Sequence, residues 1–348
     1  MNTNTTKLSI VMPVFNRSSL VAVMLDSILA NDFADYEVLA VDDGSEEETL
    51  NMLKEYQKRD NRIKLIQRTE LPKGATKCRN IGLDKAQGEF IVFFDSDDII
   101  TPQCLATRVN AIDNRNDIDF LVFPSCTYYN EKPHFKDTKY VFGHKVHDDD
   151  LQFFCQRLLP FVVVNNIYRT ASLRSYNVRW DEKLKSLQDC DFNVQAILAG
   201  MKYDYMEAKP DYGYRINQQG ASVSSGIITK EHFESHLHSI DKLYCTIQRV
   251  HGHKYDRHLY KGVLYLFNNI MTNGIDFTFA NQLCTLVRSY NSIHGILLFI
   301  RFGFCHLLSI VLSRRLARQI TMAPFIIQRL LLEKKTEQKI AQLLNSNI

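Results

Sequence analysis

Acidic side chains stand at two places where an apolar run of the sequence ends. Asp42 and Asp43 follow one such run, and Asp95 and Asp97 follow another. This negative charge would repel a phosphate-bearing ligand unless a divalent cation lay between them. Mn²⁺ and Mg²⁺ prefer oxygen ligands and commonly take one or two carboxylates together with substrate phosphates, so Asp95 and Asp97 suit that task. The alternative, that these aspartates only cap the turn that follows, stays open on this spacing alone.

Short apolar runs alternate with helical patterns over residues 7–123, as expected for βαβ units that build a mostly parallel sheet. Ligands of such sheets bind beyond the carboxyl ends of the strands. The acidic pairs should therefore share one sheet edge with the segment Pro13-Val14-Phe15-Asn16-Arg17, which ends the first run. The runs expected to be buried strands are Leu8 to Val14, Val38 to Val41, Ile63 to Ile66, Phe90 to Phe94 and Phe120 to Phe123.

Helix signals stand between these runs. Ser45 with Glu48 forms a capping-box pattern for a helix that runs towards Arg59. Thr101 before Pro102 predicts an N-cap followed by a first-turn proline. Glycines also flank a helical pattern at about 75–86. The sequence thus predicts an α/β domain.

Composition narrows the class of protein. Hydrophobic residues make up 45% and charged residues 23% of the 348 residues, which suits a globular chain with a packed core. The net charge of +3 is too small to favour nucleic acid as a partner. Eight scattered cysteines indicate neither a zinc site nor a disulfide framework, and the polar N-terminus lacks a signal-peptide pattern. We expect a cytoplasmic protein.

Four stretches resemble family 2 glycosyltransferases in both order and spacing. The similarity runs from Lys7 to about Ser225 and implies a GT-A (Rossmann-like) fold, a mostly parallel sheet flanked by helices. We expect this domain over 1–226, with a donor half of about 1–123 and an acceptor half of about 124–226, and a mainly helical extension over 227–348. The stretches that carry the resemblance are residues 9–17, 41–45, 78–82 and 88–98.

The resemblance implies that the first half binds a UDP-sugar. The loop after the first strand and Asp43 would hold the uracil and ribose, Asp95 would lie by the ribose and sugar, and Asp97 would bind Mn²⁺ or Mg²⁺. Arg79 resembles the family's basic residue near the donor, and an ordinary surface arginine is the alternative. The residues expected at the donor are Pro13, Val14, Phe15, Asn16, Arg17, Asp42, Asp43, Arg79, Asp95, Ser96 and Arg215.

The resemblance places the acceptor chemistry in the second half. Gln188-Asp189-Cys190-Asp191 resembles the acidic motif that carries the catalytic base, with Asp189 as the first candidate and Asp191 as the second. The family usually has Glu-Asp where this chain has Gln188-Asp189, so a neighbouring charge is missing. Tyr214-Arg215, followed by Ser222 and Ser224, resembles a late loop that closes over the diphosphate, a task that suits the planar donors of arginine. A salt-bridged loop arginine is the alternative.

These parts imply an inverting, metal-assisted single displacement. One carboxylate removes the proton of an acceptor hydroxyl while the oxygen attacks the anomeric carbon of a hexosyl or N-acetylhexosaminyl donor. The cation and Arg215 would stabilise the departing UDP. We expect the acceptor to be a glycan, a polysaccharide or a lipid-linked saccharide.

The C-terminal part suggests a membrane surface. The stretch Ile296 to Leu312 is apolar, but Arg301 and His306 interrupt it and it is shorter than the about 20 residues of a spanning helix. A basic segment follows, so we expect an interfacial helix on anionic lipid at the inner face of the cell membrane. A buried helix of the extension's core, or an oligomer contact, is the alternative.

Three other functions compete with a glycosyltransferase. A sugar-nucleotide nucleotidyltransferase would need a glycine-rich phosphate loop after the first strand, and a dinucleotide oxidoreductase would need Gly-x-Gly-x-x-Gly there. Neither pattern is present. A non-catalytic nucleotide-sugar-binding protein remains possible because of Gln188, although Asp97 and Asp189 are not needed merely to hold a nucleotide.

Overall fold

The computed structural model describes residues 6–128, 141–216, 229–273 and 277–346. The chain divides into two compact units, and the boundary expected near Gly226 lies outside the described residues. The first unit comprises Met1–Lys145, Phe161–Glu182 and Phe192–Gly220. The second comprises Val146–Pro160, Lys183–Asp191 and Ala221–Ile348. The second unit thus draws in two segments from the expected acceptor half besides the C-terminal extension.

The larger sheet of the first unit is mostly parallel, as predicted. The strands are β1 (Leu8–Val14), β2 (Tyr36–Asp42), β3 (Ile63–Gln67), β4 (Phe90–Phe93), β6 (Phe120–Val122), β9 (Asn166–Arg169) and β10 (Tyr203–Tyr205). Within the described part of the chain their order is β10-β6-β9-β4-β1-β2-β3. β1 pairs in parallel with β2 and β4, whereas β9 runs antiparallel between β4 and β6. The antiparallel β9 was not anticipated.

A smaller sheet continues from the end of β4. It consists of β5 (Ile99–Ile100), β11 (Tyr212–Arg215), β7 (Ser125–Tyr128) and β8 (Val141–Phe142), in the order β5-β11-β7-β8. β5 directly follows residues 95–98, the acidic loop, and pairs antiparallel with β11. The acidic loop therefore connects β4 of the larger sheet to β5 of the smaller sheet.

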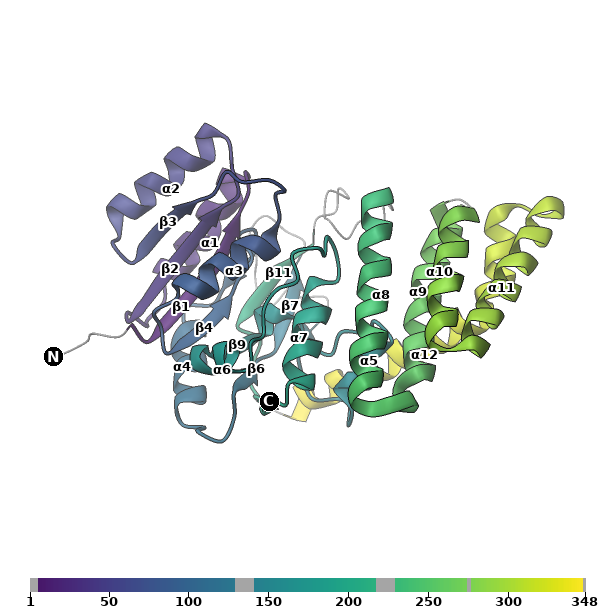
Figure 1. Ribbon diagram of the computed structural model, residues 1–348. Coiled ribbons are helices and arrows are strands. Elements are labelled where there is room, and N and C mark those ends of the chain that lie inside the picture. The colour runs from purple at the N-terminus through teal and green to yellow at the C-terminus, as the bar shows by residue number, and fades with distance from the viewer. Residues whose placement is uncertain (1–5, 129–140, 217–228, 274–276, 347–348) are drawn as a thin grey trace. The chain divides into compact units, whose positions relative to one another are not determined.

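Helices cover the larger sheet (Figure 1). They are α1 (Ser18–Leu29), α2 (Glu47–Arg59), α3 (Ala75–Lys85), α4 (Cys104–Asp113), the 3₁₀ turn η1 (Val163–Asn165), α6 (Thr170–Ser175) and α7 (Gln188–Leu198), whose first residues belong to the second unit. Alternate residues of β1 from Leu8 join the core cluster that includes the buried side of α1. Val11 packs against α3, where a Cβ on Gly82 would lie 2.2 Å from its Cγ1. Glycine at 82 thus permits this close approach.

The capping box predicted at Ser45 and Glu48 is wrong. α2 begins at Glu47 without a side-chain cap. The Ser45 hydroxyl instead accepts a hydrogen bond from the backbone N–H of Asn16 at 2.8 Å, and the hydroxyl of Ser18 donates to Glu48. Tertiary partners in the loop after β1 and at the start of α1 therefore replace the local capping contacts of both residues.

The helix start predicted at Thr101-Pro102 is also wrong by a few residues. α4 begins at Cys104, with Gln103 at the N-cap position. The N–H of Thr101 donates to the carbonyl of Asp211 at 2.9 Å, next to the pairing of β5 with β11. The backbone of Thr101 takes part in sheet pairing, so Thr101 does not cap the helix, and the helix begins at Cys104.

The second unit is helical, as predicted for the extension. Its helices are α5 (Asp150–Cys155), α8 (Lys230–His251), η2 (Gly252–Tyr255), α9 (Asp256–Asn273), α10 (Phe277–Tyr290), α11 (Ser292–Val311) and α12 (Arg314–Ser346). α11 has 20 residues and is long and apolar enough, by length and composition, to cross a membrane. The sequence-based length for this segment was therefore too short, because the helix begins at the Asn291 cap rather than at Ile296.

A buried ion pair joins α4 to the smaller sheet. Arg108 is fully buried and donates from Nε and Nη2 to both carboxylate oxygens of Asp211, at 2.8 and 2.6 Å. Its third nitrogen donates to the carbonyl of Val164 at 2.7 Å. Asp211 precedes Tyr212 at the start of β11. This bidentate pair therefore fixes where β11 begins.

We predict that Arg108→Met destabilises the first unit by about 3–5 kcal/mol, because it leaves the carboxylate of Asp211 buried without its cation. Urea unfolding followed by the fluorescence of Trp180, the only tryptophan, reports on this unit. Arg115→Met is the control, since Arg115 forms a surface pair with Asp117, and we expect it to leave the unfolding midpoint nearly unchanged. Equal midpoints for the two variants would contradict the importance of the buried pair.

Candidate active site

Three loops meet at the carboxyl edge of the larger sheet. β1 and β2 are in parallel register with Val14 opposite Asp42, and β4 lies on the other side of β1. The ends of these strands and the loops that follow them carry the residues expected at the donor, except Arg79 on α3 and Arg215 on β11. The first unit therefore brings the three motifs together, as their order along parallel strands predicted.

The loop after β1 has an unusual backbone. Asn16 and Arg17 both have positive φ values, 54° and 63°. Left-handed backbone is uncommon for residues other than glycine. Asn16 is held on both sides: its N–H donates to Ser45, and its side-chain oxygen accepts from the N–H of Glu46 at 2.8 Å. The loops after β1 and β2 are thus tied together.

The side chains of this loop differ in exposure. Val14 is buried and Pro13 is partly buried, so both mainly support the loop. Phe15 is 49% exposed, and the ammonium group of Lys73 lies 4.1 Å from the centre of its ring. The ring of Phe15 therefore offers an accessible flat surface beside a positive charge.

The acidic pair after β2 is engaged within the protein. The carboxylate of Asp42 accepts hydrogen bonds from the N–H groups of Gly44 and Ser45, which closes a turn. Asp43 is buried, contacts the guanidinium of Arg68, and accepts from the N–H of Gly74 at 2.6 Å. Asp43 thereby anchors the start of α3.

Arg79 is not an ordinary surface arginine. It lies on α3, is only 7% exposed, and donates to Asp95 at 2.5 Å. Its guanidinium also lies 4.5 Å from the ring of Trp180. Burial of α3 against the sheet directs Arg79 into the acidic loop, so the surface alternative is excluded.

Asp97 forms an ion pair with Arg17, with 2.7 Å between Oδ2 and Nη1. Its side chain is about one-third exposed. Burial and the nearby charge of Asp95 raise its pKa, against the opposing effect of Arg17. Ser96, between the two aspartates, is partly buried.

Asp98 is the most buried acid of the loop. It accepts from the hydroxyl of Tyr212 at 2.6 Å and from the N–H of Arg215 at 2.7 Å. Burial, followed by the charges of Asp97 and Asp95, raises the pKa of Asp98 well above its usual range. The guanidinium of Arg215 donates to the carbonyl oxygen of Asp97 at 2.9 Å, so β11 delivers this arginine to the acidic loop.

The donor set fits one bound divalent cation. Among the residues that the structure describes, no group of three or more His, Cys, Asp and Glu side chains could hold a metal ion. Two neighbouring carboxylates are present in Asp95 and Asp97, and the charge of Asp95 raises the pKa of Asp97. This set suits a cation that takes one or two protein carboxylates and completes its shell from phosphates and water.

The residues expected for acceptor chemistry lie at the start of α7, in the second unit. Asp189 is half-buried. Asp191 is buried and lies 2.9 Å from the ammonium nitrogen of Lys242 on α8. The side-chain amide of Gln188 donates to the carbonyl of Leu184 at 3.0 Å. Ser222 and Ser224 lie outside the described residues.

Three residues of the site were not anticipated from the sequence. Asp98 was read with its neighbours but given no role, and Arg68 and Tyr212 stand in segments without a recognisable motif. Tyr212 does carry one signal, since it lies three residues before Arg215, which the family resemblance includes.

Comparisons with known proteins show which family this chain resembles. Residues 9–179 match the family model described as glycosyl transferase family 2. The chain is 29% identical over 231 residues to poly(ribitol-phosphate) beta-N-acetylglucosaminyltransferase TarS of Staphylococcus aureus, covering 65% of this chain and 38% of that protein. It is 27% identical over 238 residues to poly(ribitol-phosphate) beta-glucosyltransferase of Bacillus spizizenii, covering 67% and 36%. The chain thus spans under two-fifths of the length of these relatives.

A solved structure shares the fold. The crystal structure of S. aureus TarS 1–349 in complex with UDP-GlcNAc matches with a TM-score of 0.66 and 21% identity, covering 91% of each chain. The resemblance drawn from the motifs and the GT-A fold that it implied are both confirmed. This chain belongs to glycosyl transferase family 2 and has the GT-A fold.

Proposed function

We propose that this chain is an inverting glycosyltransferase that moves a hexosyl or N-acetylhexosaminyl group from a UDP-sugar to the hydroxyl of a saccharide or lipid-linked saccharide. The observation that carries the proposal is the acidic loop at the carboxyl edge of the sheet, where Asp95 and Asp97 face Arg79 and Arg17. The names of the two relatives support a polymer of the polysaccharide or teichoic-acid type as acceptor. The UDP-GlcNAc complex of TarS supports UDP as the nucleotide.

The proposed roles in the first unit follow from exposure and charge. The exposed ring of Phe15 and the neighbouring Lys73 suit a flat base and the phosphates next to it. Asp97 would hold Mn²⁺ or Mg²⁺, with Asp95 beside it. A bound cation would offset the charge that develops on the departing diphosphate. Arg215, oriented by its bond to the carbonyl of Asp97, would pair with phosphate oxygens.

The proposed base is a single carboxylate on α7. It takes the proton of the acceptor hydroxyl as that oxygen bonds to the anomeric carbon and the bond from this carbon to the diphosphate breaks. One displacement inverts the anomeric configuration. Asp189 is favoured over Asp191, since Asp191 is buried against Lys242 whereas Asp189 is half-buried.

We expect UDP binding to depend on a divalent cation. UDP with Mn²⁺ should raise the melting temperature, by an amount that corresponds to about 2.7 kcal/mol when the UDP concentration is a hundred times its Kd. EDTA should remove most of this stabilisation, and Asp97→Asn should weaken it. Asp84→Asn alters an exposed aspartate paired with Arg179 and serves as the control. UDP affinity that is indifferent to EDTA would refute the role of Asp97.

We expect Asp189→Asn to lower turnover by about 10²–10⁴-fold, because an amide cannot accept the proton. UDP affinity, measured by calorimetry, should change little. Release of UDP from UDP-sugars, with water or an added saccharide as acceptor, measures turnover and also separates an enzyme from a non-catalytic binder. If Asp191→Asn abolishes turnover while Asp189→Asn stays active, the base is Asp191.

We also propose that the enzyme works on the cytoplasmic side of an anionic membrane and that α11 docks on it. Exposed apolar residues recur on α11 at helical spacing, with exposed fractions of 43–83%. The opposite side of the helix packs within the unit through Leu298, Phe302 and Cys305. The exposed residues are Ile293, Ile296, Leu297, Phe299, Ile300, Phe304, Leu307, Ile310 and Val311.

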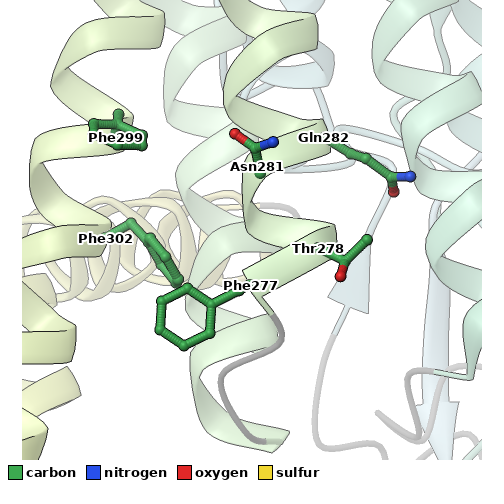
Figure 2. Close-up of a pocket in the computed structure, with 6 residues that line it drawn as sticks. All are labelled: Phe277, Thr278, Asn281, Gln282, Phe299 and Phe302. Atoms are coloured by element: carbon green, nitrogen blue, oxygen red, sulfur yellow. The ribbon is translucent and has the colours of Figure 1, made fainter.

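A hollow of about 600 Å³ opens between α10 and α11 beside this face. Figure 2 shows Phe277 and Phe302 side by side, with Phe299 further along α11 and the amides of Asn281 and Gln282 on α10. The rings of Phe277 and Phe302 are 5.1 Å apart at their centres. The aromatic side of the hollow would accept hydrocarbon from a lipid.

The charge of this region matches anionic lipid. From Phe277 to Leu332 the sequence has six arginines and no acidic residue. Arg314 and Arg315 are exposed directly after the apolar face ends at Val311. A second copy of the same face would meet like charge, whereas anionic headgroups would neutralise it.

Interfacial docking is favoured over membrane crossing. Arg301, in the middle of α11, donates to the carbonyl of Thr321 on α12 at 3.2 Å. This bond and the buried side of α11, from Gly295 to Cys305, hold the helix against the rest of the unit. A helix held in this way can bury its exposed face in the headgroup region without leaving its neighbours.

We expect the protein to float with vesicles that contain phosphatidylglycerol and to be released by high salt. Replacing Ile300, Phe304 and Leu307 by serine, or Arg314 and Arg315 by glutamate, should move it to the soluble fraction. Val250→Ser alters an exposed apolar residue of α8 and serves as the control. Failure of the wild-type protein to float would refute membrane docking. If the wild-type protein instead forms dimers and the serine variant is monomeric, a second copy of the chain covers this face.

A further inference from the structure

Arg17 occupies a strained position directly over the acidic loop. It is the N-cap residue of α1, and its backbone is left-handed with φ 63° and ψ 45°. Asn16 is left-handed too, so two consecutive residues adopt a conformation that side chains disfavour. Backbone strain of this kind persists where surrounding contacts enforce it and often marks a working residue. Here the enforced geometry brings the guanidinium of Arg17 to Asp97.

The partners of the three loop carboxylates differ in how readily they can leave. Asp95 is paired with Arg79, which is buried beneath Trp180. Asp98 is held by Tyr212 and a backbone N–H inside the protein. Asp97 is paired with Arg17, whose side chain is 48% exposed. Of these pairs, only that of Arg17 lies between partly exposed groups on a solvent-facing loop.

We propose that Arg17 is a counter-ion that exchanges places with the divalent cation. In the cation-free protein it neutralises Asp97 and holds the acidic loop. When a divalent cation binds Asp97, Arg17 turns to the diphosphate of the nucleotide. This inference rests on the proposed function, since it assigns a role in ordering the binding of the two ligands of that site.

The exchange makes cation and nucleotide bind cooperatively. A cation alone must break the pair of Arg17 with Asp97 and leaves the guanidinium without an anion. A nucleotide alone meets the charge of the acidic loop and an arginine that is already engaged. When both bind, the cation replaces Arg17 at Asp97, and the diphosphate gives Arg17 a new anionic partner. By linkage, UDP must then raise the affinity for the cation by the same factor as the cation raises the affinity for UDP.

The test is a titration of Mn²⁺, followed by electron paramagnetic resonance, with and without saturating UDP. In the wild-type protein UDP should tighten Mn²⁺ binding by about 5–150-fold, the usual range of coupling between sites. Arg17→Asn removes the guanidinium group and introduces a residue that tolerates left-handed backbone. It should bind Mn²⁺ alone more tightly than wild type, and UDP should add little. Arg17→Lys should retain most of the coupling, and Arg179→Asn, which opens a surface pair elsewhere, should match wild type.

The outcomes separate this inference from the proposed function. If the wild type binds no Mn²⁺ even with UDP, the proposed metal site is wrong. If wild type and Arg17→Asn show the same coupling, the site stands and the exchange is overturned. Circular dichroism and melting temperature check that each variant is folded, and Arg17→Gln replaces Arg17→Asn in the same titration if the asparagine variant is not.

Discussion

The structure depends on the contacts that stabilise three aspartates placed within four residues at the end of β4. Like charges so close would repel one another, and burial of Asp97 and Asp98 makes their charge costlier still. Each carboxylate is stabilised by a group from a different element: Asp95 by α3, Asp97 by the loop after β1, and Asp98 by β11. The acidic loop therefore fixes the relative positions of three elements, and they in turn hold its charges where a cation and a diphosphate can use them.

This dependence extends to residues far from the loop. The position of β11 follows from the buried pair of Arg108 and Asp211, which sets where the strand begins and therefore where Tyr212 meets Asp98. The position of α3 follows from Gly82, which allows the helix to approach β1, and from Asp43, which holds its first turn. Packing and buried electrostatics thus position two of the three groups that stabilise the carboxylates of the loop. The third, Arg17, is delivered by a strained backbone instead of a packed element.

What the sequence could predict was governed by local pattern. β1 and α3 were predicted almost to the residue because apolar periodicity and flanking glycines act within a few positions. The caps at Ser45 and Thr101 were misread because each of these residues prefers a partner about 29 to 110 positions away, in Asn16 and Asp211, which no local pattern reveals. Arg68 was missed for the same reason, since nothing near it in sequence announces its contact with Asp43. The acidic loop itself was found because the order of strands in a parallel sheet brings their carboxyl ends together.

The distribution of charge explains more than the net charge of +3. The first unit concentrates carboxylates at one sheet edge and meets them with buried or strained arginines, so most of that charge is compensated inside the protein. The second unit contains a long stretch without any acid, and its exposed arginines adjoin exposed apolar residues rather than carboxylates. Charges that are paired within the fold can form a ligand-binding site, whereas exposed arginines attract anions of another molecule. An anionic surface that also accepts hydrocarbon meets both demands of α11 at once, and a soluble polyanion would meet only one.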